Sequence, residues 1–246
     1  MTTQPFLIIA HRGAMGEAPE NTLAAFRLGL EQGANAFELD IHMSADGEII
    51  VCHDETVNRT TDGKGTIRSM TVAQLQKLDA GRWYHERFAG ERLPLLEEVF
   101  DLVPTDFVIN VEIKDCADHQ LEPRLLELLK RTGRMESVVI SSFDHKSLYN
   151  LKKLEPAIKV GLLYNSNLVS HLRGASAAQM PVYSLHPHFK HIDPEDIQEL
   201  IQNGYQVYPW TVNSESDLRS VMHTGASGII TNFPARLKQL AANEMM

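Results

Sequence analysis

Hydrophobic and polar residues alternate strictly over residues 36–42, AFELDIH. A period of two predicts a β-strand with one apolar face and one face that carries Glu38 and Asp40. Residues 44–47, SADG, read as a turn, and a second apolar run follows at 49–52. This stretch therefore predicts two extended segments joined by a short connection.

Short apolar runs and amphipathic segments continue to alternate along the chain, which predicts strands and helices in turn. Strands are predicted at 6–10, 36–42, 49–52, 107–113, 138–141, 159–163, 182–185, 206–210 and 228–231. Helices are predicted at about 22–32, 71–78, 95–103, 120–132, 145–154, 167–173, 193–204, 214–225 and 235–243. Asn21 is the predicted N-cap of the first helix.

Seven or more strand–helix units in one chain predict a (β/α)₈ TIM barrel, a fold that often reaches this length as one domain. The nine predicted strands leave one surplus, which lies in the pair 36–42 and 49–52, because their connection is too short for a crossover helix. Either member of the pair could be the irregular one. A doubly wound open sheet is the alternative fold, but no glycine-rich phosphate fingerprint follows the first strand.

Residues 55–94 interrupt this rhythm and are too long for an ordinary connection between a strand and a helix. The segment contains turn signals, a short helical stretch and three aromatic residues expected to be exposed, Trp83, Tyr84 and Phe88. Those features favour a small inserted subdomain over one end of the fold, not a disordered loop. We therefore expect one barrel domain, 1–246, with an insertion at about 55–94.

Composition limits the classes of binding partner and the cellular locations that we expect. The 246 residues are 43% hydrophobic and 22% charged, and the net charge of −9 argues against nucleic acid or an anionic membrane surface as the main partner. Only Cys52 and Cys116 occur, so there is no disulfide framework, and Cys52 is expected to be a buried thiol. The N-terminus has no basic region before its short apolar run, and no stretch reaches membrane-spanning length, which favours a cytoplasmic protein without a membrane anchor.

Acidic side chains stand at the predicted strand ends, where the active sites of such barrels lie. Glu38, Asp40 and Glu112 would form an oxygen-rich site that suits Mg²⁺ or Ca²⁺ better than zinc. Taken one at a time, these residues read equally well as solvated surface charges or structural groups. Their convergence in a closed barrel is what favours a metal site.

Basic and aromatic residues stand at the ends of these and other predicted strands. Arg12 and Lys114 would accept an anion with spread charge, such as phosphate, and the histidines His11 and His53 could divide proton transfer into base and acid. Together with a metal ion, these groups describe metal-assisted phosphoryl chemistry. Trp210 ends a predicted strand, and it could equally be a core residue or a substrate contact.

Several motifs resemble those of the glycerophosphodiester phosphodiesterase family. They are HRG at 11–13, PENT at 19–22, GANAFELDIHMSADG at 33–47, VCHDETVNRTT at 51–61 and VEIK at 111–114. The segment 55–94, with LDAGRWY and FAGERLPLLEEV, resembles that family's insertion after the second strand. The motifs SSF at 141–143, WTVN at 210–213 and GIITNFP at 228–234 extend the resemblance almost to the C-terminus. The length and the missing signal peptide resemble the family's cytosolic bacterial branch.

The resemblance implies a TIM barrel that hydrolyses glycerophosphodiesters, such as glycerophosphocholine and glycerophosphoethanolamine, to sn-glycerol 3-phosphate and an alcohol. It implies a divalent cation, Mg²⁺ or Ca²⁺, on Glu38, Asp40 and Glu112. It also implies catalysis by His11 and His53. Arg12 and Lys114 would contact the phosphate. Asn232 stands where many relatives have aspartate, and we assign it no functional weight. The expected partner is a small-molecule substrate, and a homo-oligomer stays open.

Our mechanistic hypothesis uses the glycerol hydroxyl next to the phosphoester. His11 would remove its proton, the oxygen would attack phosphorus to form a cyclic phosphate, and His53 would protonate the leaving alcohol. Direct attack by water stays open. Two other functions compete with this one: a phospholipase-type phosphodiesterase acting on lysophospholipids, and a metal-stabilised binding protein without catalysis.

Overall fold

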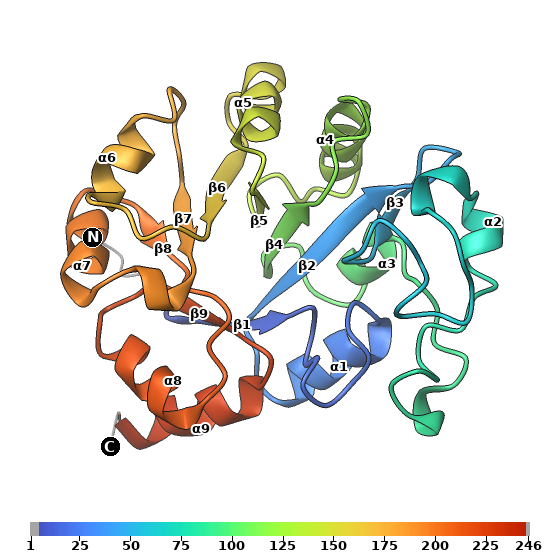
Figure 1. Ribbon diagram of the computed structural model, residues 1–246, viewed down its shortest axis with the longest axis horizontal. Helices are drawn as coiled ribbons and strands as arrows, with labels where there is room; N and C mark the ends of the chain where they lie inside the picture. The colour runs from blue at the N-terminus through green and yellow to red at the C-terminus, as the bar shows by residue number, and fades with distance from the viewer. Residues whose placement is uncertain (1–4, 245–246) are drawn as a thin grey trace.

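Eight parallel strands form the centre of the computed structural model, which describes residues 5–244, and helices surround them (Figure 1). The ring strands are β1 (Leu7–His11), β2 (Ala36–Met43), β4 (Val108–Ile113), β5 (Val138–Ser142), β6 (Lys159–Tyr164), β7 (Ser184–Pro187), β8 (Gln206–Val207) and β9 (Gly228–Thr231). The α-helices are α1 (Leu23–Glu31), α2 (Val72–Leu75), α3 (Leu96–Phe100), α4 (Leu121–Arg131), α5 (His145–Leu154), α6 (His171–Ser176), α7 (Pro194–Gln202), α8 (Glu215–Met222) and α9 (Pro234–Glu244).

The two ends of the sheet meet and close the ring. The strand order is β8-β7-β6-β5-β4-β2-β1-β9. Backbone hydrogen bonds from Ser227 N to Val207 O (3.0 Å) and from Ile230 N to Pro209 O (3.1 Å) join β9 to the chain around β8. The predicted (β/α)₈ barrel is therefore confirmed, and the open-sheet alternative is wrong.

The surplus strand is β3 (Ile49–Val51), which lies outside the ring. It pairs antiparallel with the end of β2, so that Ile41 lies beside Val51 and Met43 beside Ile49. The short turn before it permits only an antiparallel partner, as in any hairpin. The pair 36–42 and 49–52 is thus one ring strand followed by a hairpin arm.

Several predicted boundaries are wrong by a few residues. The strand predicted at 206–210 ends at Val207 because Pro209 has no amide hydrogen to give to a ladder. The strand at 182–185 lies instead at Ser184–Pro187. The helix at 167–173 begins only after Ser170, whose hydroxyl caps it. The helices predicted at 71–78 and 95–103 are the shorter α2 and α3.

The first helix begins one residue later than predicted. Thr22, not Asn21, is its N-cap, and the Thr22 hydroxyl accepts a hydrogen bond from Ala25 N (3.2 Å). Asn21 adopts a left-handed conformation with φ of +56°. Its side chain is therefore free to point toward the strands, where it reaches Asp40.

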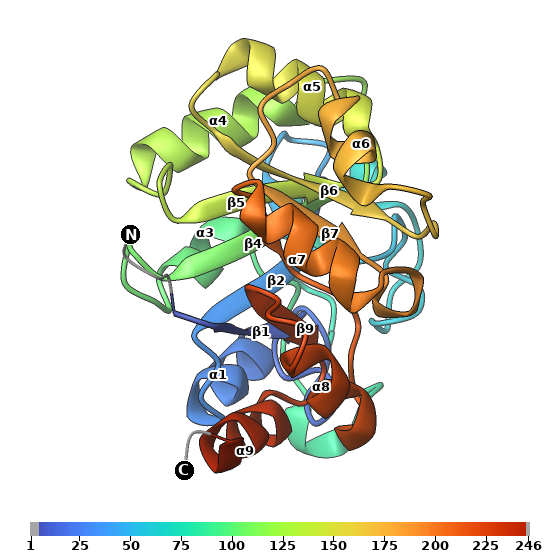
Figure 2. The same cartoon turned by 90° about the vertical axis from the view of Figure 1, so that its left-hand side faces the viewer.

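Both faces of β2 are buried. Phe37, Leu39 and Ile41 are fully buried in the core between the strands and the surrounding helices. The opposite face, with Glu38 and Asp40, is equally shielded from solvent, because it faces the interior of the ring. Figure 2 shows these layers from the side, with α4 and α5 on one side of the strands and α1 and α9 on the other.

The segment 55–94 lies beside β2, β3 and α1 (Figure 1). Its apolar side chains form a small core of their own with the end of β3 and the residue after it, made of Ile50, Cys52, Val57, Ile67, Leu75, Ala80 and Leu93. Trp83 is 41% exposed, as predicted, but Tyr84 and Phe88 are half-buried. Tyr84 donates a hydrogen bond to Gly16 O (2.9 Å), which ties the segment to the loop after β1.

Two further predictions, on Cys52 and on membrane-spanning helices, can be compared with the structure. Cys52 is 2% exposed, and burial raises the pKa of its thiol to about 12, so it is the inert buried group that the sequence predicts. Over residues 5–244, every helix falls short of the length and apolar character that a bilayer crossing requires.

Candidate active site

Strand register brings three carboxylates together at one end of the ring. In the parallel ladders, His11 of β1 lies beside Glu38 of β2, and Asp40 lies beside Glu112 of β4. Paired residues of parallel strands share a face, so these side chains all point into the ring. The carboxylate oxygens of Glu38, Asp40 and Glu112 come within 4.8 Å of one another.

These acids are strongly perturbed by their surroundings. Burial, followed by the charges of Asp40 and Glu112, holds the pKa of Glu38 well above its usual range. Burial and the charge of Asp40 raise the pKa of Glu112 to about 7. Burial also opposes ionisation of Asp40, but the cations Arg12 and Lys114 outweigh it and lower its pKa. Asp40 is thus the permanent anion of the trio, and the other two need a further positive charge to ionise fully.

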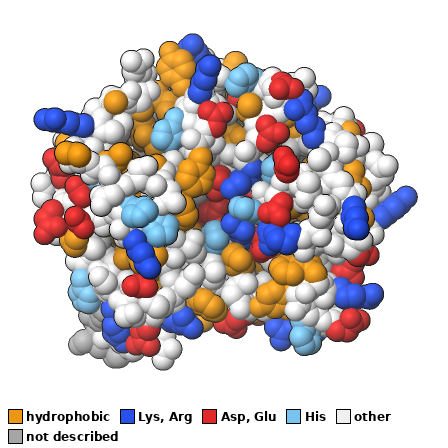
Figure 3. Space-filling model, viewed as in Figure 1, with side chains coloured by type: hydrophobic (Ala, Val, Ile, Leu, Met, Phe, Trp, Pro, Cys, Tyr) orange, Lys and Arg blue, Asp and Glu red, His pale blue; other side chains and the backbone are white. Residues whose placement is uncertain are grey.

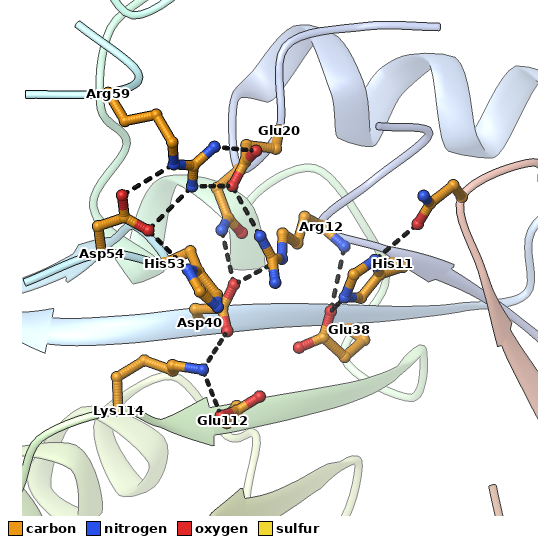
Figure 4. A network of polar contacts seen from close by, with 12 residues as sticks. His11, Arg12, Glu20, Glu38, Asp40, His53, Asp54, Arg59, Glu112 and Lys114 are labelled. Atoms are coloured by element: carbon orange, nitrogen blue, oxygen red, sulfur yellow. Dashed lines mark hydrogen bonds and ion pairs between the residues drawn. The ribbon is translucent and has the colours of Figure 1, made fainter. Parts of the chain in front are cut away.

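Two cations lie against the trio (Figure 4). Arg12 Nε lies 3.1 Å from Asp40 Oδ2. Lys114 Nζ donates to Glu112 Oε1 at 2.6 Å and lies 3.6 Å from Asp40 Oδ1. Both side chains are largely shielded from solvent, with exposed fractions of 15% for Arg12 and 18% for Lys114. Water therefore weakens their attraction to the carboxylates less than it would at the surface.

The left-handed turn after β1 places Arg12. Arg12 has φ of +53° and Gly13 has φ of +78°. A Cβ on Gly13 would lie 2.5 Å from the carbonyl carbon of Ala25, so only glycine lets the turn lie this close to α1. The HRG motif therefore has two roles: Gly13 lets the turn pack against α1, and Arg12 supplies a charge to the site.

His11 is buried and held by Asn232. Its Nδ1 lies 2.7 Å from Asn232 Oδ1, and because that oxygen can only accept, Nδ1 carries the hydrogen. Its Nε2 is then the unprotonated nitrogen, and it lies 3.8 Å from Glu38 Oε2. Burial and the nearby charge of Arg12 lower the pKa of His11 to about 4, so the ring is neutral near pH 7.

His53 has a charged partner instead. Its Nδ1 donates to Asp54 Oδ1 at 2.7 Å, and its side chain is 32% exposed. His42, buried on β2, fixes the backbone here, since its Nε2 lies 3.1 Å from His53 O. The Asp54 carboxylate therefore orients the His53 ring through Nδ1, as the Asn232 amide orients the ring of His11.

An ionic network joins these groups to the segment 55–94. Arg59 donates to both oxygens of Asp54 and to both oxygens of Glu20. Glu20 also accepts from Arg12 Nη1 at 2.8 Å. The hydrogen bonds and charges of Arg59 and Arg12 outweigh the burial of Glu20 and lower its pKa. The chain of contacts runs from His53 to the carboxylate trio without a gap (Figure 4).

A cavity of about 110 Å³ opens between these groups. Its lining consists of His11, Arg12, Glu38, His53, Asn110, Glu112, Lys114, Phe143, Leu163, Trp210, Thr211 and Ile230. Figure 3 shows the hollow at the centre of this face, with blue, red and pale blue side chains gathered around it. The Trp210 and Phe143 rings meet edge to face at 5.6 Å, and Trp210 Nε1 donates to His186 O (2.7 Å). An aromatic wall therefore faces the charged groups across the cavity.

The donor set fits a hard divalent cation. Asp40 Oδ1 is buried and receives no hydrogen bond within residues 5–244, although Lys114 lies nearby. Three carboxylates with such an oxygen among them match the all-oxygen ligands that Mg²⁺ and Ca²⁺ prefer. A cation here would also remove the cost of ionising Glu38 and Glu112.

All eight residues proposed from the sequence lie in this region, and seven of them line the cavity. Asp40 is covered by its ion pairs instead. The sequence analysis missed six residues that support or complete the site: Glu20, Asn21, Asp54, Arg59, Phe143 and Asn232. The first four lie in the quoted motifs PENT and VCHDETVNRTT, which could have drawn attention to them. Asn232, to which the sequence analysis assigned no functional weight, contacts His11 directly.

Comparison with known proteins identifies the family of this chain. The model of the glycerophosphoryl diester phosphodiesterase family matches residues 11–236. A glycerophosphodiester phosphodiesterase of Caldanaerobacter subterraneus subsp. tengcongensis is 44% identical over 239 residues, covering 95% of this chain and 97% of that protein.

Two solved structures show the same fold. A phosphodiesterase of Oleispira antarctica, in complex with the product sn-glycerol-3-phosphate, has a TM-score of 0.86 and 30% identity, covering 94% of both chains. A glycerophosphodiester phosphodiesterase of Agrobacterium tumefaciens has a TM-score of 0.84 and 26% identity, covering 94% of this chain and 98% of that one. The protein therefore belongs to the glycerophosphoryl diester phosphodiesterase family and is a phosphoric diester hydrolase.

Proposed function

We propose that the protein hydrolyses glycerophosphodiesters, such as glycerophosphocholine and glycerophosphoethanolamine, to sn-glycerol 3-phosphate and an alcohol, and that it needs a divalent cation. The observation that carries the proposal is a trio of buried carboxylates, with oxygens within 4.8 Å of one another, beside a cavity that is lined by two histidines with different partners. The glycerol 3-phosphate bound by the Oleispira antarctica relative supports the product.

Glu38, Asp40 and Glu112 would hold Mg²⁺ or Ca²⁺. When bound, such a cation supplies Lewis acidity and positive charge toward phosphate oxygens and a neighbouring hydroxyl. Arg12 and Lys114 place two more positive charges beside the trio, and both lie at the cavity. They would bind the phosphate and balance the charge that develops on its oxygens.

His11 is the better general base of the pair. Its ring is neutral near pH 7, and the hydrogen bond to Asn232 leaves Nε2 free to accept a proton. In this role it would take the proton of the glycerol hydroxyl beside the phosphoester. That oxygen then attacks phosphorus, and a cyclic phosphate forms as the bond to the alcohol breaks.

His53 is the better general acid. Asp54 accepts from its Nδ1 and orients the ring, so a proton carried on Nε2 would pass to the leaving alcohol. Water then opens the cyclic phosphate with the two roles reversed. Direct attack by water on the diester is the competing route. A substrate with hydrogen in place of the neighbouring hydroxyl separates the two, since normal turnover of it would exclude the cyclic phosphate.

The first experiment is release of glycerol 3-phosphate from glycerophosphocholine by the purified protein with Mg²⁺, with Ca²⁺ and with a chelator. We expect release with a metal and none with the chelator. Glu112→Gln should raise the metal concentration for half-maximal rate by about tenfold or more. Glu97→Gln, a surface acid that pairs with Arg131, is the matched control and should behave like the parent. Equal release in the chelator would contradict the metal requirement.

The competing functions make different demands. A phospholipase acting on lysophospholipids would hydrolyse lipid vesicles and spare water-soluble diesters. A binding protein would keep its affinity for ligand without both histidines and would show no turnover at all. The cytoplasmic location and a homo-oligomeric state stay predictions of the sequence.

A further inference from the structure

The guanidinium group of Arg59 forms hydrogen bonds with two carboxylates, those of Asp54 and Glu20, at the edge of the site. Arg59 Nε and Nη2 donate to Asp54 at 2.8 and 2.9 Å, and Nη1 and Nη2 donate to Glu20 at 2.7 and 2.9 Å. Each carboxylate thus receives two hydrogen bonds from the same planar group, the forked geometry that arginine provides and lysine does not. Figure 4 shows Arg59 between the two acids.

The two acids differ in what holds them. Glu20 has a side chain only 5% exposed and is also held by Arg12, so it is a fixed point. Asp54 is 28% exposed, and among residues 5–244 the side-chain groups that hold its carboxylate are those of Arg59 and His53. Glu20 therefore fixes Arg59, and Arg59 in turn sets the plane of the Asp54 carboxylate.

That plane decides where His53 points. Asp54 Oδ1 accepts the Nδ1 hydrogen of His53 at 2.7 Å, so a rotation of the carboxylate turns the ring and moves its Nε2. Arg59 belongs to segment 55–94, outside the ring of strands, and does not line the cavity. We propose that Arg59 is a positioning residue that holds the general acid His53 through Asp54, and that the inserted segment thereby controls protonation of the leaving alcohol.

The proposal rests on the proposed function and predicts a selective defect. An alcohol such as choline leaves phosphorus only if it is protonated, whereas p-nitrophenolate leaves without a proton. Loss of Arg59 should therefore slow release of choline in the first step and spare release of p-nitrophenolate, whereas the ring opening that follows is the same for both substrates. A residue that merely stabilised the fold would affect both substrates alike.

The experiment measures the single-turnover rate of alcohol release from both diesters by the metal-loaded protein in excess, so that ring opening does not contribute. Arg59→Ala should lower this rate for glycerophosphocholine by roughly tenfold to a hundredfold, below the full contribution of a general acid, and change it for the p-nitrophenyl diester by less than about threefold. Arg59→Lys keeps the positive charge but cannot give two hydrogen bonds to each carboxylate. It should therefore also be slow on glycerophosphocholine and nearly unchanged on the p-nitrophenyl diester. His53→Ala sets the upper limit of the effect.

Arg82→Ala is the matched control. Arg82 is another arginine of the same segment, and its ion pairs, with Asp79 and Glu86, stay within that segment. It should match the parent on both diesters. If Arg59→Ala melts below the assay temperature, the ratio of the two rates in Arg59→Lys decides instead.

The outcomes separate the two hypotheses. A parent protein that hydrolyses neither diester with any metal refutes the proposed function itself. A parent that hydrolyses both, with Arg59 variants that are unchanged or equally slow on the two, refutes the positioning role alone.

Discussion

At the scale of single residues, His11 and His53 differ most in the hydrogen-bond partner of their Nδ1 atoms. Asn232 offers His11 a neutral oxygen in a buried place, whereas Asp54 offers His53 a full charge near the surface. Burial beside a neutral partner keeps the His11 ring unprotonated, and the Asp54 carboxylate orients the His53 ring through Nδ1. The proposed division of labour between base and acid rests on these partners.

Replacement of His53 tests this division. His53→Ala should lower kcat on glycerophosphocholine by about 10²–10⁴-fold, because general acid catalysis contributes on that order. His85→Ala, a histidine on the surface of the inserted segment, is the control and should leave kcat unchanged. A loss of no more than about tenfold in His53→Ala would remove the acid role.

Glu20 should make stability depend on pH. Because its folded pKa lies below the ordinary 4.5, its ion pairs stabilise the fold fully above that value, and the stabilisation is lost as the pH falls through the lower folded pKa. Glu20→Gln should therefore lower the free energy of unfolding at pH 7 by roughly 1–3 kcal/mol, the usual range for hydrogen bonds to charged groups.

Urea unfolding at pH 7 and at about pH 3 measures this effect. The difference between the parent and Glu20→Gln should shrink at the lower pH, because it lies below the ordinary pKa of 4.5 and part of the stabilisation is lost there. Glu17→Gln, on the exposed side of the same loop, should show little difference at either pH. A difference that grows toward low pH would contradict the assignment.

At the scale of elements, the β1–α1 connection shows what the sequence could and could not reveal. Glycine and proline signals located the loop and the helix, but the residue that caps the helix was wrong by one. Local pattern places Asn21 and Thr22 equally well at a cap. Only the ring tells them apart, because it brings Asp40 within reach of Asn21 and draws that side chain inward.

The close approach of this loop to α1 gives a sharp stability test. Gly13→Ala meets both a left-handed backbone and an overlap with Ala25, so it should lower the free energy of unfolding by more than about 2 kcal/mol. Gly133→Ala is the matched control, with φ of +68° and open space around a Cβ, and should cost only roughly 1 kcal/mol. Equal losses in urea unfolding would show that the overlap is relieved.

At the scale of the whole molecule, the order of elements was predictable and the register was not. Apolar runs alternating with amphipathic helices revealed the barrel, and they placed the trio on β2 and β4. The periodicity of 49–52 could not reveal that it forms an outer hairpin, since a buried strand reads the same in either direction. Supporting contacts such as His11 to Asn232 join residues 221 positions apart, and no local pattern encodes them.

The ring should open first where its pairing is thinnest. β2 and β4 pair along the whole of Ala36–Ile41 and Val108–Ile113, whereas β8 has only two residues and meets β9 through isolated hydrogen bonds. In hydrogen exchange, amides of β2 and β4 should be the slowest, and the amides of Ser227 and Ile230 should be among the fastest of the ring strands. Uniform protection around the ring would contradict this picture.

The contact between His11 and Asn232 also bears on how the protein is made. A ribosome produces Glu38, Asp40 and Glu112 long before residue 232, so a growing chain carries the whole trio before Asn232 exists. On the proposed mechanism, such a chain, or one truncated before residue 232, could gather metal ions but would lack the partner that orients its base. The reaction would therefore begin only once residue 232 has been made and β9, which precedes it, has docked beside β1.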